Sequence, residues 1–449
     1  MALLSSPFIA AYIRRRSQHY YSTPPESRFF YHPPLPPPTV PSTSPAPSAH
    51  FLSTPHLTTR LLYHIIPIPW QHYARDRGVL RLSDVFALLF GPLLFLPSHA
   101  ALLLQHLLPS SQPLRLRYSL SSQLTVEVHN AHRREVGGAA VLSPVVVFTH
   151  GGAWGSGNAL MYRLLSSCFD TQLHCVTLTH NYHHYPTADV AQQVGQLRQL
   201  LVWLDGEGEK FGGDVSKVIL VGHSSGAHLT LLHLLTAPAT STVSSTSAAD
   251  AFSPFAPAKE RELSVIGAIG LSGVYNIASH YQYESRRGVH EISPMQPACH
   301  HSPNFDRHSP TLIARQKRTE GVESTVPLVL LVHGDRDETV PDLASRRLCE
   351  AMGGRLRRLA VTVEGRRVAE VEEWEAAQSG SGACECVIYA DGDHGCTILS
   401  LMTRTGTHLF HTLRTFIHRC VDESAEVERR RSETAATVHL EQLKVLSRL

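Results

Sequence analysis

Short apolar runs alternate with longer amphipathic stretches along the chain from Leu114 onwards. Each run is rich in Val, Ile and Leu, which is typical of strands that are buried on both faces of a sheet. The runs that predict strands are LTVEVH, VVVFTH, CVTLTH, KVILVG, SVIGAIGL, PLVLLVHG and CECVIYA. The clearest amphipathic stretch, Asp189–Leu204, has apolar residues at helical spacing: Val190, Val194, Leu197, Leu200, Leu201 and Leu204. This alternation predicts the α/β class, with a mostly parallel sheet covered by helices on both faces.

The first part of the chain, residues 1–110, differs in composition and lacks this alternation. Residues 1–59 are rich in proline and serine; such a sequence cannot bury enough apolar area to offset its ordering entropy, so a disordered arm is predicted. Residues 60–110 include the run Val85–Leu108, which has no Asp, Glu, Lys or Arg and is long enough to cross the hydrocarbon core of a bilayer. We therefore predict that residues 60–110 associate with a membrane. The alternative is an apolar helical hairpin that packs on the following domain or lies in the interface.

The alternating pattern extends over residues 111–420, which we expect to form one α/β domain. Two segments interrupt the pattern: a low-complexity loop near 236–262 and a charged, partly helical insertion near 353–382. The tail 421–449 is charged and is predicted to form a peripheral helix.

Composition narrows the classes of function. Charged residues make up 17% of the chain, against about 25% in soluble domains, and such a lean surface is compatible with membrane contact. The formal net charge of +2, without a long basic stripe, argues against a nucleic-acid partner. The 8 cysteines include no CxxC pair, so we expect reduced thiols in a cytosol-facing domain. The clusters HNYHHYP and ACHHS lack zinc-ligand spacing, so neither a metal site nor a cofactor is predicted.

The most specific local signal is the sequence KVILVGHSSGAHLTLLHLL. An apolar strand leads into Gly222-His223-Ser224-Ser225-Gly226, and an apolar helix follows at once. The two glycines allow the sharp strand-to-helix turn that raises a serine above the edge of a sheet in α/β-hydrolases. The predicted helix N-terminus at Ser224 also favours developing negative charge. We therefore predict that Ser224 is a nucleophile.

A serine nucleophile needs a base and an acid that orients the base, and in this type of fold both follow the serine, the acid first. The segment LVLLVHGDRDETVP offers Asp335 and Asp337 after a buried strand. Asp337 is favoured because it lies beyond the tight turn, whereas Asp335 is suited to capping that turn. The next loop, in CECVIYADGDHGC, offers His394, the only histidine between His333 and His408. We predict His394 as the base and Asp337 as the orienting acid.

The glycines of VVVFTHGGAWGSG indicate a close approach of the backbone to another group. Their spacing matches neither GxGxxG nor GxxxxGK[ST], which excludes the common phosphate loops. An oxyanion hole instead uses N–H groups from a loop of this kind together with the residue after the nucleophile. We predict that Gly151, Gly152, Ala153 and Ser225 form it, with the N–H groups of Gly152, Ala153 and Ser225 as the donors.

These segments, together with GLSGVYNI, SRRGVH and SPNFDRHSPT, resemble the α/β-hydrolase family of isoprenylcysteine α-carbonyl methylesterases. The resemblance extends roughly from Arg60 to Ile417, without the two insertions. His223 and Ser225 stand where the family pattern has Gln and Ala. An apolar region before the catalytic domain is also similar to the membrane-bound members of the family.

The resemblance implies a serine carboxylic-ester hydrolase that demethylates prenylcysteine methyl esters, small or on prenylated proteins, at a membrane. It also implies an endomembrane of the endoplasmic reticulum or Golgi type, with the catalytic domain facing the cytosol. A general carboxylesterase or lipid esterase would keep every catalytic residue and differ in its pocket, and an arylformamidase would use the same elbow. A non-catalytic scaffold with the hydrolase fold is the alternative from another class, and the complete Ser, Asp and His set argues against it.

Overall fold

The computed structural model describes residues 113–119, 123–129, 134–136, 139–237, 263–286, 290, 293–321, 326–359, 383–402 and 407–446. All of them belong to a unit that spans Arg60–Leu449. The predicted arm 1–59, the apolar run Val85–Leu108 and most of the two insertions lie outside these residues. Among the helices within them, none combines the length and the apolar character needed to cross a bilayer.

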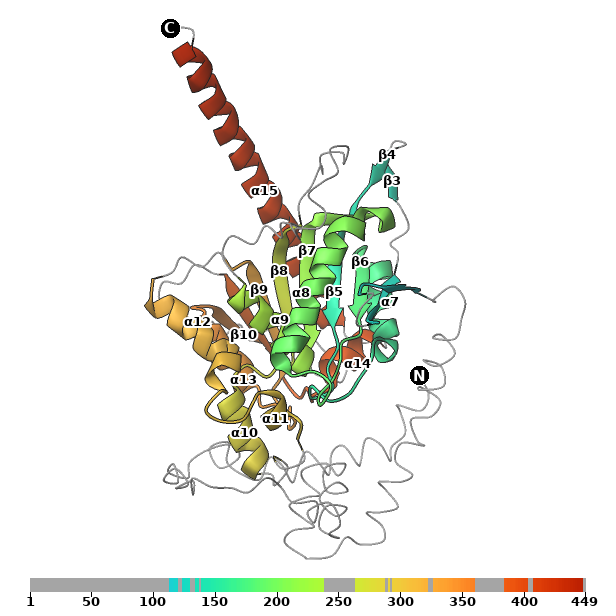
Figure 1. The fold of residues 1–449 in the computed structure, drawn as a ribbon, viewed down its shortest axis with the longest axis vertical. Coiled ribbons are helices and arrows are strands. Elements are labelled where there is room, and N and C mark those ends of the chain that lie inside the picture. Colours follow the sequence, from blue (N-terminus) through green and yellow to red (C-terminus); the bar gives the residue numbers. More distant parts are fainter. Residues whose placement is uncertain are drawn as a thin grey trace, which may run out of the picture. The chain divides into compact units, whose positions relative to one another are not determined.

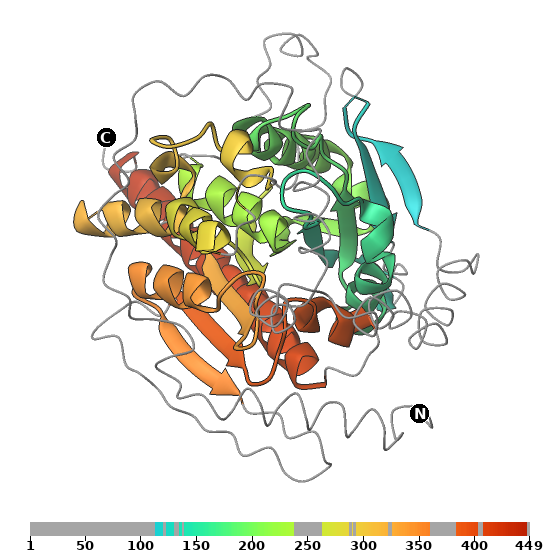
Figure 2. The same ribbon diagram turned by 90° about the horizontal axis from the view of Figure 1, so that it is seen from below.

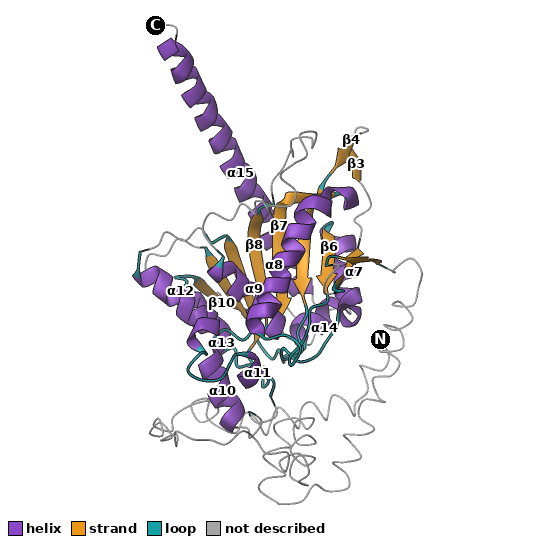
Figure 3. Ribbon diagram, viewed as in Figure 1, coloured by secondary structure: helices purple, strands orange, loops and turns teal. Residues whose placement is uncertain are grey.

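A sheet of 9 strands forms the centre of this unit, in the order β1-β2-β6-β5-β7-β8-β9-β11-β10 (Figures 1 and 3). β1 pairs antiparallel with β2 and β2 with β6, whereas all the other neighbours in the sheet are parallel. The strands are β1 Leu114–Arg117, β2 Thr125–His129, β5 Ser143–Thr149, β6 Val176–His180, β7 Gly213–His223, β8 Val265–Leu271, β9 Leu328–Gly334, β10 Arg355–Leu359 and β11 Cys384–Tyr389. A separate hairpin consists of β3 Arg134–Val136 and β4 Ala139–Val141.

Every strand predicted from an apolar run is confirmed, but the two edge strands were missed. β1 has the sequence LRLR and β10 the sequence RLRRL, so both are rich in arginine and neither reads as a buried run. Edge strands tolerate this because one of their sides has no strand neighbour, and charge there discourages pairing with other chains. The insertion predicted to begin at Gly353 therefore starts with a strand that pairs parallel to β11, and its remaining residues, 360–382, lie outside the described part of the chain.

Helices cover both faces of the sheet, as predicted (Figure 2). Apolar residues of α8, α9, α12 and α13 join one core layer, and those of α7, α14 and α15 join the other. The helices are α7 Arg163–Leu173, α8 Val190–Glu207, α9 Ser225–Thr236, α10 Ile277–Arg286, α11 Met295–Ala298, α12 Pro310–Thr319, α13 Leu343–Ala351, α14 Cys396–Met402 and α15 Thr407–Leu446. α15 continues without interruption across the boundary expected between residues 420 and 421.

The strands supply both core layers because their side chains alternate between the two faces. In β7, Val218 and Leu220 belong to the layer under α8 and α9, whereas Ile219 and Val221 belong to the opposite layer. All four side chains are almost fully buried. A strand sandwiched in this way reads as a continuous apolar run, which is why KVILVG predicted a central strand.

Helix α8 begins and packs as its sequence predicts. Asp189 is the N-cap and accepts a hydrogen bond from the N–H of Gln192 at 2.8 Å, and the Gln192 side chain accepts one from the N–H of Asp189 at 3.0 Å. This capping box satisfies two N–H groups that the first helical turn would otherwise leave unpaired. The apolar positions predicted to face the core are all buried.

Parallel pairing brings the functional segments to a single edge of the sheet. β5, β7, β9 and β11 run in one direction, so the loops that follow Thr149, His223, Gly334 and Tyr389 all leave at the same edge. In open α/β sheets, ligands bind outside the carboxyl ends of the strands. The predicted serine, acid, histidine and glycine loop each follow one of these strands.

The packing of α8 predicts a contrast between two neighbouring residues. Leu201 is 1% exposed and Val202 is 42% exposed. Leu201→Ala should lower the free energy of unfolding by about 2–5 kcal/mol, because it removes buried methyl groups and leaves a cavity. Val202→Ala should cost about 0.5 kcal/mol or less. Urea unfolding measures both, and equal losses would contradict the orientation of α8.

Candidate active site

The predicted nucleophile lies on a strained turn between β7 and α9. Ser224 has φ 53° and ψ −122°, a backbone conformation that non-glycine residues rarely adopt. A Cβ atom on Gly222 would lie 2.5 Å from the carbonyl oxygen of Gly226, and one on Gly226 would lie 2.1 Å from that of Thr149. Only glycine fits at either position, so the two glycines permit the turn that holds Ser224 above the sheet edge.

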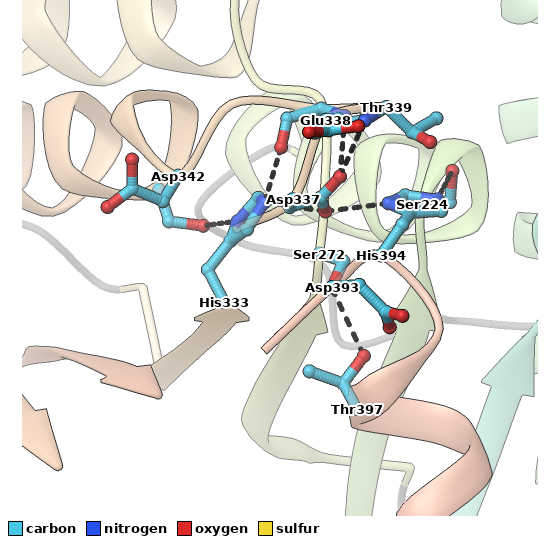
Figure 4. A network of polar contacts seen from close by, with 12 residues as sticks. Ser224, Ser272, His333, Asp337, Glu338, Thr339, Asp342, Asp393, His394 and Thr397 are labelled. Atoms are coloured by element: carbon cyan, nitrogen blue, oxygen red, sulfur yellow. Dashed lines mark hydrogen bonds and ion pairs between the residues drawn. The ribbon is translucent and has the colours of Figure 1, made fainter. Parts of the chain in front are cut away.

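His394 and Asp337 lie in line with this serine (Figure 4). Nε2 of His394 is 3.1 Å from Oγ of Ser224, and Nδ1 of His394 is 2.7 Å from Oδ2 of Asp337. Because the carboxylate can only accept, Nδ1 carries the proton and Nε2 presents its lone pair to the hydroxyl. This is the geometry of a nucleophile, a base and an orienting acid.

The loops after β9 and β11 are joined by backbone contacts, which bring Asp337 and His394 together. A Cβ atom on Gly334 would lie 2.1 Å from the carbonyl oxygen of Gly392, so the two loops touch where a larger residue would not fit. The N–H of Arg336 donates to the carbonyl of Gly392 at 2.9 Å. Oδ1 of Asp335 accepts from the N–H of Asp391 at 2.7 Å. Of the two acids considered in the sequence, Asp337 therefore reaches His394, whereas Asp335 joins the loops.

The Asp337 carboxylate is buried but has several donors. Oδ1 accepts the N–H groups of Thr339 and Val340 at 2.9 and 2.8 Å, and Oδ2 lies 3.0 Å from Nε2 of His333 as well as near His394. Burial by itself raises the pKa of this carboxyl, but the hydrogen bonds from His333 and His394 outweigh burial and hold the pKa well below its usual value. Asp337 therefore remains an anion at neutral pH.

The glycine loop after β5 packs directly against the serine turn. A Cβ atom on Gly151 would lie 3.0 Å from Cβ of Ser224, and the N–H of Gly151 donates to the hydroxyl of Tyr162 at 3.3 Å. Gly152 and Ala153 have φ 136° and 51°. Within the described residues, the N–H groups of Gly152, Ala153 and Ser225 have no hydrogen-bond acceptor. Gly151 thus has its N–H engaged by Tyr162, unlike the other three N–H groups.

Trp154 holds the same loop in place through a buried hydrogen bond. Its indole is 1% exposed, and Nε1–H donates to Nδ1 of His228 on α9 at 3.1 Å. Nε2–H of His228 in turn donates to the carbonyl of His308 at 2.7 Å. The glycine loop is therefore connected through one buried imidazole to the helix that follows Ser224 and to the segment before α12.

Two histidines next to the predicted residues were given no role from the sequence. His333 contacts Asp337 through Nε2. His223 stands beside Ser224, with Nδ1 3.3 Å from the Tyr162 hydroxyl and Nε2 3.4 Å from the carbonyl of His394. The signal was present in both cases, since a titratable side chain ends an otherwise apolar strand, in VLLVHG and in KVILVGH.

No metal or cofactor was predicted. Within the residues that the structure describes, no group of three or more His, Cys, Asp and Glu side chains is arranged to hold a metal ion.

The strand order, the strand–serine–helix turn and the chain order Ser, Asp, His define a fold of the α/β-hydrolase type. The family model described as BD-FAE matches residues 137–352, a range that includes Ser224 and Asp337 and ends before His394.

Curated proteins resemble about half of the chain. A probable isoprenylcysteine alpha-carbonyl methylesterase of Arabidopsis thaliana is 26% identical over 215 residues, 47% of this chain and 47% of its own length. Esterase LipQ of Mycobacterium tuberculosis is 25% identical over 214 residues, 47% of this chain and 46% of its own length. The chain thus spans about half the length of the curated relatives it matches. Among solved structures, esterase B of Lactobacillus rhamnosis is 15% identical with a TM-score of 0.49, covering 71% of this chain and 87% of that one.

Buried neutral histidines predict that the fold is sensitive to acid. Burial lowers the pKa of five histidines, to about 4 for His150 and His233 and to about 3 for His180, His223 and His228. The unfolded chain binds protons near pH 6.5, where the folded protein does not. Stability should therefore be full above about pH 6.5 and be lost as the pH falls towards 4, by about 1.4 kcal/mol per pH unit for each histidine.

His233 on α9 offers a test of this sensitivity. Its Nδ1 is buried without a hydrogen-bond partner in the described part of the chain. His233→Leu should lower the dependence of unfolding free energy on pH between about 6 and 5 by about 1.4 kcal/mol per unit, measured by urea unfolding at several pH values. An unchanged slope would show that His233 is not held neutral.

Proposed function

We propose that this protein is a serine hydrolase of carboxylic esters, with Ser224 as nucleophile, His394 as base and Asp337 as orienting acid. The observation that carries the proposal is the unbroken hydrogen-bonded line from the Ser224 hydroxyl through His394 to the Asp337 carboxylate. The similarity of residues 137–352 to the BD-FAE model and of half the chain to named esterases supports it.

The proposed reaction has two steps. Oγ of Ser224 attacks the ester carbonyl while Nε2 of His394 takes its proton, and Asp337 stabilises the imidazolium that forms. His394 then gives this proton to the leaving alcohol, which departs and leaves an acyl group on Ser224. In the second step His394 removes a proton from water, the hydroxide attacks the acyl group, and the proton returns to Oγ as the carboxylic acid leaves.

The negative charge on the carbonyl oxygen needs donors that are already in place. We assign this role to the N–H groups of Gly152, Ala153 and Ser225, while Gly151 allows the loop to lie against Ser224. The positive φ of Gly152 and Ala153 turns successive peptide groups of the loop in a way that an extended strand end would not. Removing one donor of an oxyanion hole typically costs about 10²–10³ in turnover.

For the substrate, we propose the methyl ester of a C-terminal prenylcysteine, presented at an endomembrane with the catalytic domain facing the cytosol. The plant relative whose name includes this chemistry supports the proposal, as does the uncharged apolar run Val85–Leu108 ahead of the domain. Such a run would hold the enzyme where a lipid-tailed substrate resides. Methanol would then be the leaving alcohol.

A general carboxylesterase is the second candidate. Esterase LipQ of Mycobacterium tuberculosis matches a region of nearly the same length at nearly the same identity as the plant relative. The departures at His223 and Ser225 also lie beside the nucleophile. Both candidates use the same catalytic residues and differ only in which acyl and alcohol groups are accepted.

Replacing the nucleophile tests the reaction class. Ser224→Ala should abolish labelling by a fluorophosphonate probe and lower ester hydrolysis by about 10⁴-fold or more, because no hydroxyl remains to attack. Ser225→Ala is the matched control, since it keeps the backbone N–H and should still be labelled. Labelling of the Ser224→Ala protein would contradict the assignment.

Methanol release from farnesylcysteine methyl ester tests the substrate. The wild-type protein in detergent should release methanol from this ester faster than from a short-chain methyl ester, because the apolar tail adds binding energy. If the wild type cleaves short acyl esters but releases no methanol from the prenylated ester, the second candidate replaces the first.

A further inference from the structure

Asp337 has a second histidine partner that lies behind it. His333 is the last residue of β9 but one, and its side chain is completely buried, as are those of Asp337 and Ser345. The imidazole lies within hydrogen-bond distance of the Asp337 carboxylate (Figure 4). Its other nitrogen lies within hydrogen-bond distance of the hydroxyl of Ser345 on α13. The imidazole has no exposed surface that could meet a substrate.

The neighbours of His333 determine where its proton lies. Nε2 lies 3.0 Å from Oδ2 of Asp337 and 2.8 Å from the carbonyl of Val340, and both of these atoms can only accept. Nε2 must therefore carry hydrogen and donate to both. Nδ1 lies 2.7 Å from Oγ of Ser345, a hydroxyl that can donate to it. Ser345 thus holds His333 in the tautomer that points a donor at the carboxylate.

His333 and His394 contact the same oxygen of Asp337. Oδ1 of Asp337 is occupied by two backbone N–H groups of its own loop. Oδ2 is shared between His333 at 3.0 Å and His394 at 2.7 Å. Each donor takes part of the negative charge of that oxygen, so less of it remains to stabilise the imidazolium form of His394 than with one donor.

We propose that His333 is a positioning residue for the reaction: it holds Oδ2 of Asp337 against His394 and, by sharing that oxygen, limits the basicity of His394. The inference rests on the proposed function, because it concerns the base of that reaction. His333 acts only through Asp337.

A purely structural role is the alternative, since a buried, fully hydrogen-bonded histidine also stabilises a fold. The two roles differ in one observable. A structural histidine affects unfolding, whereas charge sharing on Oδ2 changes the pH at which His394 becomes a free base.

Other titratable groups also face Asp337 and His394 and must stay constant in a test. They are His223 at the end of β7, Asp335, Arg336, Asp391 and Asp393 in the two loops, and Cys396 on α14. A change confined to His333 leaves every one of them in the chain. A shift of the pH profile therefore reports on the contact with Oδ2.

The test measures the rate of fluorophosphonate labelling of Ser224 in the full-length protein as a function of pH. The rate rises with pH as the base loses its proton, and this readout needs no knowledge of the ester substrate. In His333→Leu, the carboxylate keeps its two backbone donors on Oδ1. Oδ2 loses the donor from residue 333 and keeps the one from His394. The midpoint of the acid limb should rise by about 0.5 pH unit, because the imidazolium is better compensated.

Three further variants make the result specific. His333→Gln extends an amide donor towards Oδ2 and should restore the wild-type midpoint, whereas the shorter His333→Asn should not reach it and should behave like Leu. Where the Leu variant does not fold, the Asn and Gln pair carries the same comparison. His233→Leu, the same substitution at a buried histidine away from Asp337, should leave the midpoint at the wild-type value.

The outcomes separate the inference from the proposed function. If wild-type Ser224 is not labelled, the proposed function fails. If wild type is labelled but the midpoint of the Leu and Asn variants is unchanged or lower, the positioning role of His333 is overturned. A higher midpoint in both, restored by Gln, supports it.

Discussion

A carboxylate taken out of water keeps its charge only where hydrogen-bond donors replace the water it has lost. Asp337 meets this condition with two backbone N–H groups on one oxygen and two imidazoles on the other. The backbone donors come from its own loop, so the turn after β9 forms around the carboxylate. The same charge fixes the tautomer of His394 and thereby aims a lone pair at Ser224. The candidate site therefore depends on the Asp337 carboxylate, whose negative charge is stabilised by these four hydrogen bonds.

The distance between loops is the second constraint. Asp337 and His394 are far apart in sequence and meet because parallel strands β9 and β11 are direct neighbours and end at the same edge. Gly334 and Gly392 then allow the two loops to touch without intervening side chains. The Ser224 turn is held in the same way, since Gly226 lies against the carbonyl of Thr149 at the end of β5. Close backbone contact at both places sets side-chain distances to within hydrogen-bond reach.

Local sequence was sufficient for the central strands, for α8 and for the residue types of the candidate site. Buried parallel strands read as apolar runs, and the capping box of α8 lies within four residues of sequence, so neither needs distant information. β1 and β10 were missed for the opposite reason: their arginines are acceptable only because each strand lies at an edge, which the order of strands decides. The contacts of His333 and His223 were also missed, because an isolated histidine near a strand end does not show what it faces.

The sequence by itself determined the alternation of strands and helices, the strained serine turn and the short set of acids and histidines that follow it, because each is written in contiguous residues. It favoured Asp337 over Asp335 from their positions in one loop. Only the tertiary structure shows what each carboxylate contacts: Asp335 joins the loop of His394 through a backbone N–H, and Asp337 turns inward to the imidazole. The same holds for Gly151, whose N–H is engaged by Tyr162 from a later segment. These hydrogen bonds join loops that come together only because their strands pair. No stretch of contiguous residues encodes such a contact, so the sequence alone could not predict it.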